Sequence, residues 1–323
     1  MANSSFKNLV LSTSPYFEVL VRHIYWRNVG LFKAISEKIK FIIPNKPSPE
    51  LSGFSYDTLR SFLSSNGVKH NSLMLVHSTY SPFKGKGKTA NQLIDFLLDI
   101  VGDGGTLAMP AMPKLTSQKP SEDYLKDSTD EVFFYDPMKS KVKTGVLPLM
   151  LSKRSQSIRS EHPINTMVAL GPLAKEIMDN NLSGSDPLPC GESSSWFRCY
   201  QNDAVIVGLG LDLTHSLTMI HVAEDTNKNW PVKDWYIERQ FSIKTSDGLV
   251  NKTLKERAPQ WGALYFAERT LCSDLISNGI LKSTVIDGIT VELLHARKLM
   301  DFLKGTKHDS YPYYGVKNAE RKD

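Results

Sequence analysis

Apolar and polar segments alternate most clearly between residues 73 and 113. Leu73 to Val76 form an unbroken apolar run, the pattern of a strand buried on both faces of a sheet. A Gly/Ser/Lys-rich segment follows, and residues 91–101 then place apolar side chains on one broad helical face that ends at Gly102. Thr106 to Met109 is the next apolar run. This order predicts a βαβ unit whose first loop follows the carboxyl end of a strand, where open α/β sheets bind ligands.

The rest of the chain repeats this alternation of helical and extended patterns. The periodicity predicts helices at 16–43, 56–66, 144–153, 172–178, 193–200, 214–226, 263–278 and 291–303, and strands at 167–170, 204–207 and 235–254. Residues 285–289 contain a tight turn at Asp287-Gly288. Residues 114–143 are polar and weakly periodic, as is typical of a long loop. We therefore expect a three-layer α/β/α sandwich with a mixed central sheet and a small antiparallel addition.

The N-terminal segment differs in composition from the rest. Residues 1–46 contain seven Lys or Arg and two Glu, an excess of five that equals the formal net charge of the whole chain, +5. Its amphipathic pattern fits a helix on a membrane surface or an arm packed on the main domain; the second is favoured, because charged faces are usually just solvated. Prolines then mark a linker. The expected organisation is an arm and linker at 1–50, a main domain at 51–304 and a polar tail at 305–323.

Composition excludes several classes of protein. With 323 residues and 41% hydrophobic content, the chain can bury one large core or two modest ones. No apolar run is long enough to span a membrane, and the N-terminus lacks a secretory pattern, so a cytoplasmic protein with three reduced cysteines is expected. The cysteines show no metal-binding spacing. Beyond residue 46 the charges balance, which is not the pattern of a nucleic-acid-binding protein.

Two glycine motifs suggest ligand binding only weakly. GKGKT at 85–89 lacks the earlier glycine of a nucleotide-hydrolysing loop, because that position is Pro82. Lys84, Lys86 and Lys88 beside a helix N-terminus still suit a diphosphate or a 3′-phosphate, with a solvated loop as the alternative. GLGLD at 208–212 lacks the next glycine of a dinucleotide fingerprint and is typical of a tight turn.

One histidine has a carboxylate at helical spacing. His221 and Glu224 are three residues apart on one helix face, and Asp212 precedes that helix. A histidine beside a carboxylate can act as a general base near neutral pH, although a single histidine is more often structural. His77, at a strand end, and His162, in RSEHP, have the same two interpretations.

Several motifs follow one another in the order of a known family. The chain contains LVHSTYSPFKGKGKTANQLIDFLLDIVGDGGTLAMPAM at 75–112, YDP at 135–137, TGVLP at 144–148, RSEHPINTMVALGP at 159–172, GESS at 191–194, VIVGLGLDLT at 205–214 and HVAE at 221–224. Over about residues 55–300 it resembles the aminoglycoside 3-N-acetyltransferase family. Two features depart from that family. A histidine that its resistance enzymes usually carry is missing from NNLSGSDPLPCGE, and residues 1–50 lie outside its usual core.

The resemblance implies an acyl-CoA-dependent N-acyltransferase that needs no metal. By this analogy, the acyl-CoA would contact His77, Ser78, Thr79, Phe83, Lys84, Gly85, Lys86, Thr144, Gly145 and Val146. His221 matches the family's catalytic histidine, and an imidazole of pKa about 6.5 can accept the proton of an attacking amine. Glu192 and Asp212 are both candidates for the carboxylate that orients it. Glu224, His162 and Asp225 are the candidates for contacts with the acceptor.

The expected acceptor is an amino sugar. Enzymes that bind polycationic antibiotics need an acidic cleft, whereas this chain is neutral beyond residue 46 and basic before it. The charge therefore favours an anionic acceptor, such as a nucleotide-linked amino sugar for surface polysaccharide synthesis. Two alternatives stay open: an aminoglycoside 3-N-acetyltransferase that confers resistance, and a catalytically silent CoA-binding protein. Peripheral membrane contact through the arm, the acyl chain length and the choice between monomer and homodimer also stay open.

Overall fold

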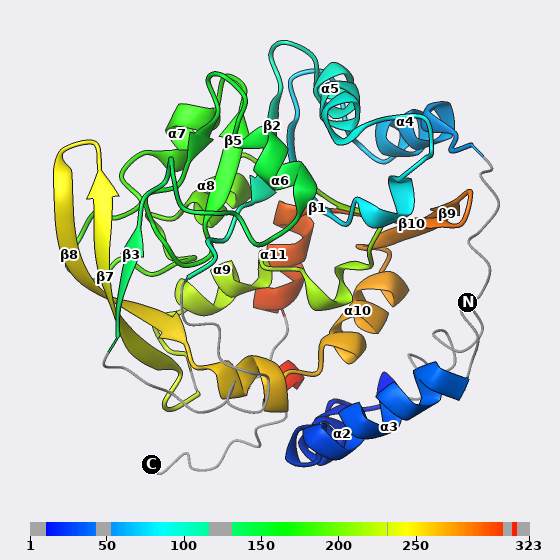
Figure 1. Ribbon diagram of the computed structural model, residues 1–323, viewed down its shortest axis with the longest axis vertical. Coiled ribbons are helices and arrows are strands. Elements are labelled where there is room, and N and C mark those ends of the chain that lie inside the picture. The colour runs from blue at the N-terminus through cyan, green and yellow to red at the C-terminus, as the bar shows by residue number, and fades with distance from the viewer. Residues whose placement is uncertain (1–10, 43–52, 116–130, 231, 306–311, 315–323) are drawn as a thin grey trace.

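A mixed sheet organises the chain (Figure 1). The computed structural model describes residues 11–42, 53–115, 131–230, 232–305 and 312–314. Within them, seven strands form one sheet in the order β4-β5-β2-β1-β6-β10-β9. β1 runs parallel to β2 and β6, and the other neighbours are antiparallel. The bounds are β1 Leu73–Ser78, β2 Thr106–Pro110, β4 Ile158–Arg159, β5 Met167–Leu170, β6 Val205–Leu209, β9 Lys282–Ile286 and β10 Ile289–His295.

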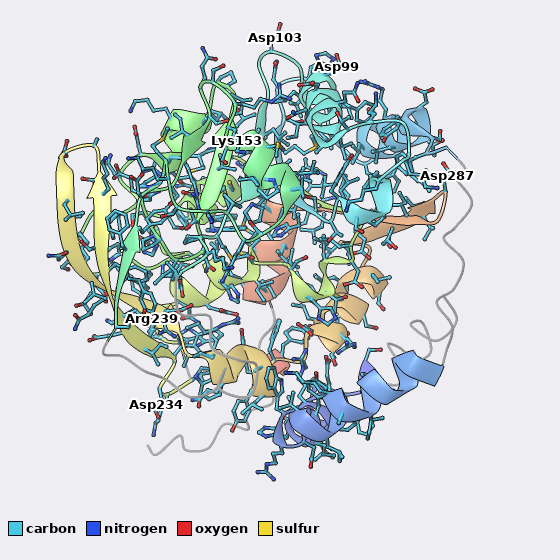
Figure 2. The ribbon with its side chains drawn as sticks, viewed as in Figure 1. Asp99, Asp103, Lys153, Asp234, Arg239 and Asp287 are labelled. Atoms are coloured by element: carbon cyan, nitrogen blue, oxygen red, sulfur yellow. The ribbon has the colours of Figure 1, made fainter. Side chains whose placement is uncertain are left out.

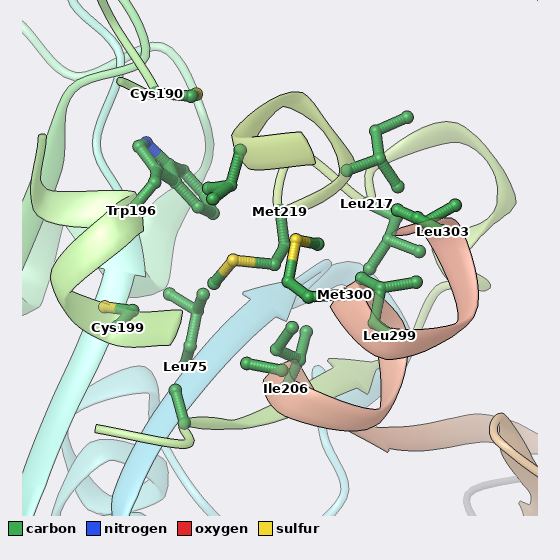
Figure 3. Close-up of a cluster of buried hydrophobic side chains, with 14 of the residues drawn as sticks. Leu75, Cys190, Trp196, Cys199, Ile206, Leu217, Met219, Leu299, Met300 and Leu303 are labelled. Atoms are coloured by element: carbon green, nitrogen blue, oxygen red, sulfur yellow. The ribbon is translucent and has the colours of Figure 1, made fainter. Parts of the chain in front are cut away.

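Each face of this sheet supports its own core, because successive strand residues point to opposite sides. On one face, Leu75 and Ile206 pack with Met219, Leu299 and Met300 (Figure 3). That core includes residues of α7 Ala174–Met178, α8 Ser195–Gln201, α9 Ile220–Asp225, α10 Glu268–Ser277 and α11 Ala296–Gly305. The core on the other face includes residues of α4 Tyr56–Ser65, α5 Ala90–Val101 and α6 Val146–Leu151. The predicted three-layer α/β/α sandwich is therefore confirmed.

Helix α5 shows how local sequence builds the predicted βαβ unit. The hydroxyl of Thr89 accepts from the backbone N–H of Gln92, whose side chain accepts in return from the N–H of Thr89. This capping box satisfies two donors that a helix start leaves unpaired. Gly102 ends the helix with φ of +68°, a conformation that favours glycine. The loop between β1 and α5 is therefore held at both ends.

A second, smaller sheet lies beside the first. It contains β3 Val132–Tyr135, β7 Tyr236–Thr245 and β8 Gly248–Arg257, with β7 and β8 antiparallel and β3 parallel to β7. The antiparallel pair was expected, but β3 falls in the segment predicted to be a loop. Its inward Phe133 and Tyr135 alternate with exposed apolar Val132 and Phe134, so the usual apolar/polar period is absent. The remainder of the predicted loop, residues 116–130, lies outside the described residues.

Several predicted helices have different limits. The helix predicted at 263–278 is α10 Glu268–Ser277, which follows a π-helical turn at Trp261–Tyr265. Residues 291–295 belong to β10, which pairs between β6 and β9, and the last helix begins at Ala296. Sheet pairing thus overrides a helical pattern. Residues 213–215 form a 3₁₀ turn, and α9 is confined to Ile220–Asp225. The N-terminal helix is two helices, α2 Pro15–Arg27 and α3 Val29–Ile42, which meet at Asn28 and not at Gly30.

Helix α2 packs on the main domain, as the favoured interpretation of the arm expected (Figure 1). Buried Glu18 accepts hydrogen bonds from the backbone N–H groups of Arg269 and Thr270, which belong to the otherwise uncapped first turn of α10. Arg22 donates to the carbonyls of Gly262 and Ala263 in the π-helical turn Trp261–Tyr265. None of the described helices is both long and apolar enough to cross a lipid bilayer.

Candidate active site

A cleft of about 910 Å³ lies at the carboxyl ends of β2 and β6. Met112 lines it shortly after β2, and Thr214 to Thr218 line it after β6. The end of β8 contributes Arg257, and the arm contributes Arg22 and Trp26. Arg239 of β7, labelled in Figure 2, also lines the cleft. The cleft therefore combines the usual ligand position of an α/β sheet with walls from the small sheet and from the arm.

His221 lies on the wall of this cleft and is held by Glu224. Helix α9 places the two side chains one turn apart, and His221 Nδ1 lies 2.6 Å from Glu224 Oε2. An ionised carboxylate only accepts hydrogen bonds, so Nδ1 carries the proton and Nε2 is the acceptor. The His221 side chain is 15% exposed, and Nε2 has no hydrogen-bond partner in the described part of the chain. The ring can therefore take a proton from a group in the cleft.

Glu224 is itself fixed from the opposite side. Its second oxygen, Oε1, accepts a 2.5 Å hydrogen bond from the hydroxyl of Tyr314. Arg257 donates to the same hydroxyl at 3.0 Å. Both carboxylate oxygens are thus occupied, and the residue is buried. The expected contact of Glu224 with an acceptor amine does not occur in this arrangement, because the carboxylate has no exposed oxygen to offer.

Burial and the neighbouring groups together set the protonation of this pair. Burial and, secondarily, the nearby Arg257 hold the pKa of His221 below its ordinary value, despite the opposing effect of Glu224. Burial alone would raise the pKa of Glu224, but His221, Arg257 and the Tyr314 hydroxyl together lower it. The pair therefore consists of a neutral imidazole and an ionised carboxylate near neutral pH, which is the state of a general base.

The two carboxylates expected to orient His221 do not do so. Glu192 and Asp212 are exposed, and neither hydrogen-bonds His221 among the described residues. Asp212 precedes a 3₁₀ turn and not the predicted continuous helix, so its side chain does not lie beside the histidine. Glu224 takes this role because its spacing on α9 places it directly against Nδ1.

His162 and Asp225 are structural in this arrangement and do not line the cleft. His162 is buried; its Nδ1 accepts from the N–H of Ile164 and its Nε2 donates to the carbonyl of Pro187. Asp225 accepts from the Tyr236 hydroxyl and from the Cys190 N–H, each at 2.9 Å. Burial raises the pKa of Asp225 to about 7. Neither residue offers a group to an acceptor, which corrects the expectation for both.

The structure brings together the two segments expected to contact acyl-CoA. Thr144 donates to the carbonyl of Pro110 at 2.6 Å. Gly145 lies beside Ser78, since a side-chain carbon on it would be 3.7 Å from the Ser78 carbonyl oxygen. The N–H of Thr79 donates to Leu209, which ties the loop to β6. Thr79, Gly145 and Val146 are exposed, so this junction presents polar backbone and side chains at the carboxyl ends of β1, β2 and β6.

The other residues of the predicted acyl-CoA set differ in their exposure. His77 and Phe83 are buried, and burial lowers the pKa of His77 to about 4. Both side chains pack beneath the surface of the loop and are not accessible to a ligand. Lys84 and Gly85 are exposed and Lys86 is half-buried. The ammonium of Lys88 instead lies 4.8 Å from the ring centre of Tyr56 and 5.5 Å from that of Phe96.

The residues of the site that were not found from the sequence include Arg22, Trp26, Arg257 and Tyr314. Arg257 ends β8, and Tyr314 lies in the segment expected to be a polar tail. The available signal was the pair of aromatic residues, Tyr313 and Tyr314, within this otherwise polar segment. Both are buried against the main domain. No local sequence pattern links any of these four residues to His221, because each of them is far from it in the chain.

Comparisons with known proteins agree with this architecture. Residues 75–306 match the family model described as aminoglycoside 3-N-acetyltransferase. Aminoglycoside N(3)-acetyltransferase IX of Micromonospora chalcea is 29% identical over 164 residues, which span 49% of this chain and 57% of that relative.

Solved structures show the same fold. AAC-IIIb in a binary complex with CoASH superposes with a TM-score of 0.65 at 21% identity, covering 78% of this chain and 95% of that one. Aminoglycoside acetyltransferase AAC(3)-Xa gives 0.64 at 21% identity, covering 78% and 91%. The family model covers most of the chain, including His221 and Glu224, and the protein therefore belongs to the aminoglycoside 3-N-acetyltransferase family.

Proposed function

We propose that the protein transfers an acyl group from acyl-CoA to the amine of an amino sugar. The observation that carries the proposal is the His221–Glu224 pair, with a neutral imidazole facing a cleft of about 910 Å³. As the amine attacks the thioester carbon, Nε2 of His221 takes an amine proton. The C–S bond then breaks, an amide forms, and the thiolate of CoA receives the proton from the imidazolium. A base of this kind supplies about 10²–10⁴-fold in rate.

The proposed acyl-CoA site is the junction of the loops after β1 and β2. Ser78, Thr79, Thr144, Gly145 and Val146 would contact the pantetheine and thioester end. Lys84 and Lys86, with the Gly85 backbone, supply positive charge and N–H groups suited to phosphates. The structure of AAC-IIIb with CoASH, which shares this fold, supports acyl-CoA as the donor.

An aminoglycoside is the acceptor that the comparisons support. The family model and the Micromonospora relative are both named for 3-N-acetylation of aminoglycosides. Structures of the same fold include AAC(3)-IVa with apramycin and AAC-VIa with sisomicin. We therefore propose aminoglycoside N-acetylation as the first activity to test.

An anionic amino sugar is a second candidate, and the charge of the cleft favours it. The lining includes Arg22, Lys143, Arg239 and Arg257 but only the acids Glu256 and Glu268. Arg22 pairs with Glu268 and Arg239 with Glu256, and counted over the whole lining the cationic side chains outnumber the acidic ones by four to two. A polycationic antibiotic would be repelled by such a surface, whereas a phosphate on a nucleotide-linked amino sugar would be attracted.

A substrate panel tests both candidates. Purified protein is incubated with acetyl-CoA and, separately, sisomicin, apramycin or UDP-glucosamine; thiol release and product mass are then measured. Transfer to an antibiotic supports the first candidate, and transfer to the nucleotide-linked sugar supports the second. His221→Asn serves as the matched inactive control. Binding of acetyl-CoA without acyl transfer to any amine would favour a catalytically silent CoA-binding protein and contradict the proposal.

A further inference from the structure

The arm carries more than half of the large exposed apolar side chains of the described chain. Large apolar side chains are exposed at fifteen described positions, and eight of them lie between residues 16 and 35. Leu20 is 56% exposed and Leu31 is 61% exposed. We call this set the arm surface; its members are Tyr16, Phe17, Leu20, Ile24, Tyr25, Leu31, Phe32 and Ile35. Scattered exposed apolar residues are normal, but a concentration of them usually marks an interaction site.

Helical spacing makes the arm surface continuous. Phe17, Leu20 and Ile24 follow one another at three and four residues and therefore share one side of α2. On α3, Leu31 and Ile35 are four residues apart. The rings of Tyr25 and Phe32 are 5.5 Å apart across the turn that joins the two helices. The two stripes thus form one surface over both helices.

The inner side of the same helix is already occupied. Glu18 and Val19 are buried, and Glu18 and Arg22 bond α10 and the π-helical turn. Docking on the main domain therefore explains the inner residues of α2 and leaves the outer ones unexplained. A helix that only needed to pack on the domain would carry polar residues on its outer side.

Charge indicates what covers the arm surface. Residues 1–46 hold seven cationic side chains and two acidic ones. Glu18 is buried against α10, and Arg22 pairs with it and with Glu268, so neither residue contributes to the exposed charge of the arm. Arg27 and Lys33 are exposed on the same two helices as the apolar side chains. Apolar side chains beside Lys and Arg are the pattern of helices that lie in the plane of an anionic membrane surface.

We propose that the arm docks the protein on an anionic lipid surface, with α2 and α3 lying along it. A second copy of the chain fits less well, because a two-fold contact would place this basic segment against itself. The proposal does not depend on which reaction the cleft supports. Since Arg22 and Trp26 of α2 also line the cleft, docking would hold the cleft beside the lipid.

Vesicle binding tests the proposal with matched variants of the full chain. Vesicles of phosphatidylcholine with about 30% phosphatidylglycerol are compared with phosphatidylcholine alone, at low and high salt. Leu20→Glu/Ile24→Glu changes the arm surface, and Leu249→Glu/Ile276→Glu makes the same change at exposed positions elsewhere. All four positions are exposed, so both variants should keep the unfolding temperature of the wild type.

The wild type and the Leu249/Ile276 variant should co-sediment with the anionic vesicles, more weakly as salt rises. The Leu20/Ile24 variant should bind at least about tenfold more weakly. Absence of wild-type binding to anionic vesicles, or equal binding by the two variants, would overturn the proposal. A wild-type dimer that the Leu20/Ile24 variant alone dissociates, without vesicle binding, would instead assign the arm surface to a second copy.

Discussion

The hydroxyl of Tyr314 donates a 2.5 Å hydrogen bond to Oε1 of Glu224, although the two residues are 90 positions apart. The other oxygen of Glu224 is engaged by His221. Tyr314 lies beyond residue 306, where the match to the family model ends. The C-terminal segment of this chain therefore reaches back to fix the carboxylate that holds the histidine.

Removing this hydroxyl should weaken catalysis without unfolding the protein. In Tyr314→Phe, Glu224 loses one anchor, and we expect turnover to fall by about tenfold, as for other residues that orient a catalytic group. The Michaelis constant for acyl-CoA should stay unchanged. Tyr313→Phe is the control, because the hydroxyl of Tyr313 bonds Asp274 and not Glu224. Equal turnover for both variants would restrict Tyr314 to a structural role.

Replacement of His221 tests the proposed base. His221→Asn keeps polarity but accepts no proton near neutral pH, so turnover should fall by about 10²–10⁴-fold. Binding of acyl-CoA, measured by calorimetry, should be nearly unchanged because the proposed phosphate contacts are in the loop after β1, away from His221. A variant that keeps more than about a third of wild-type turnover would show that this base does not limit the reaction.

The pH dependence should follow the lowered pKa of His221. The imidazole acts when neutral, so the rate should rise with pH as the imidazolium loses its proton. Burial and the nearby Arg257 lower the pKa of His221, which places the midpoint below the ordinary histidine value of 6.5. The measurement is kcat/KM against pH with an acceptor that does not titrate in this range. A midpoint above 6.5 would mean that Glu224 outweighs burial.

Replacing the lysines of the loop between β1 and α5 should have two different effects on acyl-CoA binding. Lys84→Ala with Lys86→Ala should raise the Michaelis constant for acyl-CoA by about threefold to tenfold and reduce its salt dependence. Lys88 is the matched control, because its ammonium lies over Tyr56 and Phe96. Lys88→Ala should change stability more than the Michaelis constant. If the double variant binds acyl-CoA as the wild type does, the loop is simply solvated.

Deletion of residues 1–46 should leave a folded but less stable protein. The hydrophobic cores on both faces of the main sheet, and the core of the small sheet, contain no described residue before Phe54. The deletion removes Glu18, which caps α10, and loss of such a charged cap costs about 2 kcal/mol. Thermal unfolding should therefore remain cooperative at a lower midpoint.

The same deletion also removes Arg22 and Trp26 from the cleft. The Michaelis constant for the acceptor should rise while that for acyl-CoA stays constant. Glu18→Gln is the companion variant, since it weakens the cap but keeps the cleft residues. Loss of cooperative unfolding in the shortened chain would show that the arm completes the core.

Local pattern alone predicted the elements whose sequence signals lie within a few neighbouring residues. The βαβ unit from β1 to β2 follows from an apolar run, a capping box and a glycine stop, all within neighbouring residues. The pairing of His221 with Glu224 on one helix face was also visible, because a spacing of three residues places side chains together on any helix. The family resemblance rests on such ordered local motifs.

The tertiary structure decided everything that depends on contacts between distant segments. Residues 291–295 read as helix but form β10, because two strands on either side offer backbone partners. Glu224 could have faced an acceptor, but Tyr314 and His221 occupy both of its oxygens. Arg22 and Trp26 reach the cleft because α2 packs on the main domain, where Glu18 bonds the first turn of α10 and Arg22 bonds the π-helical turn. A sequence specifies these contacts through packing and charge between segments that only the folded chain brings together.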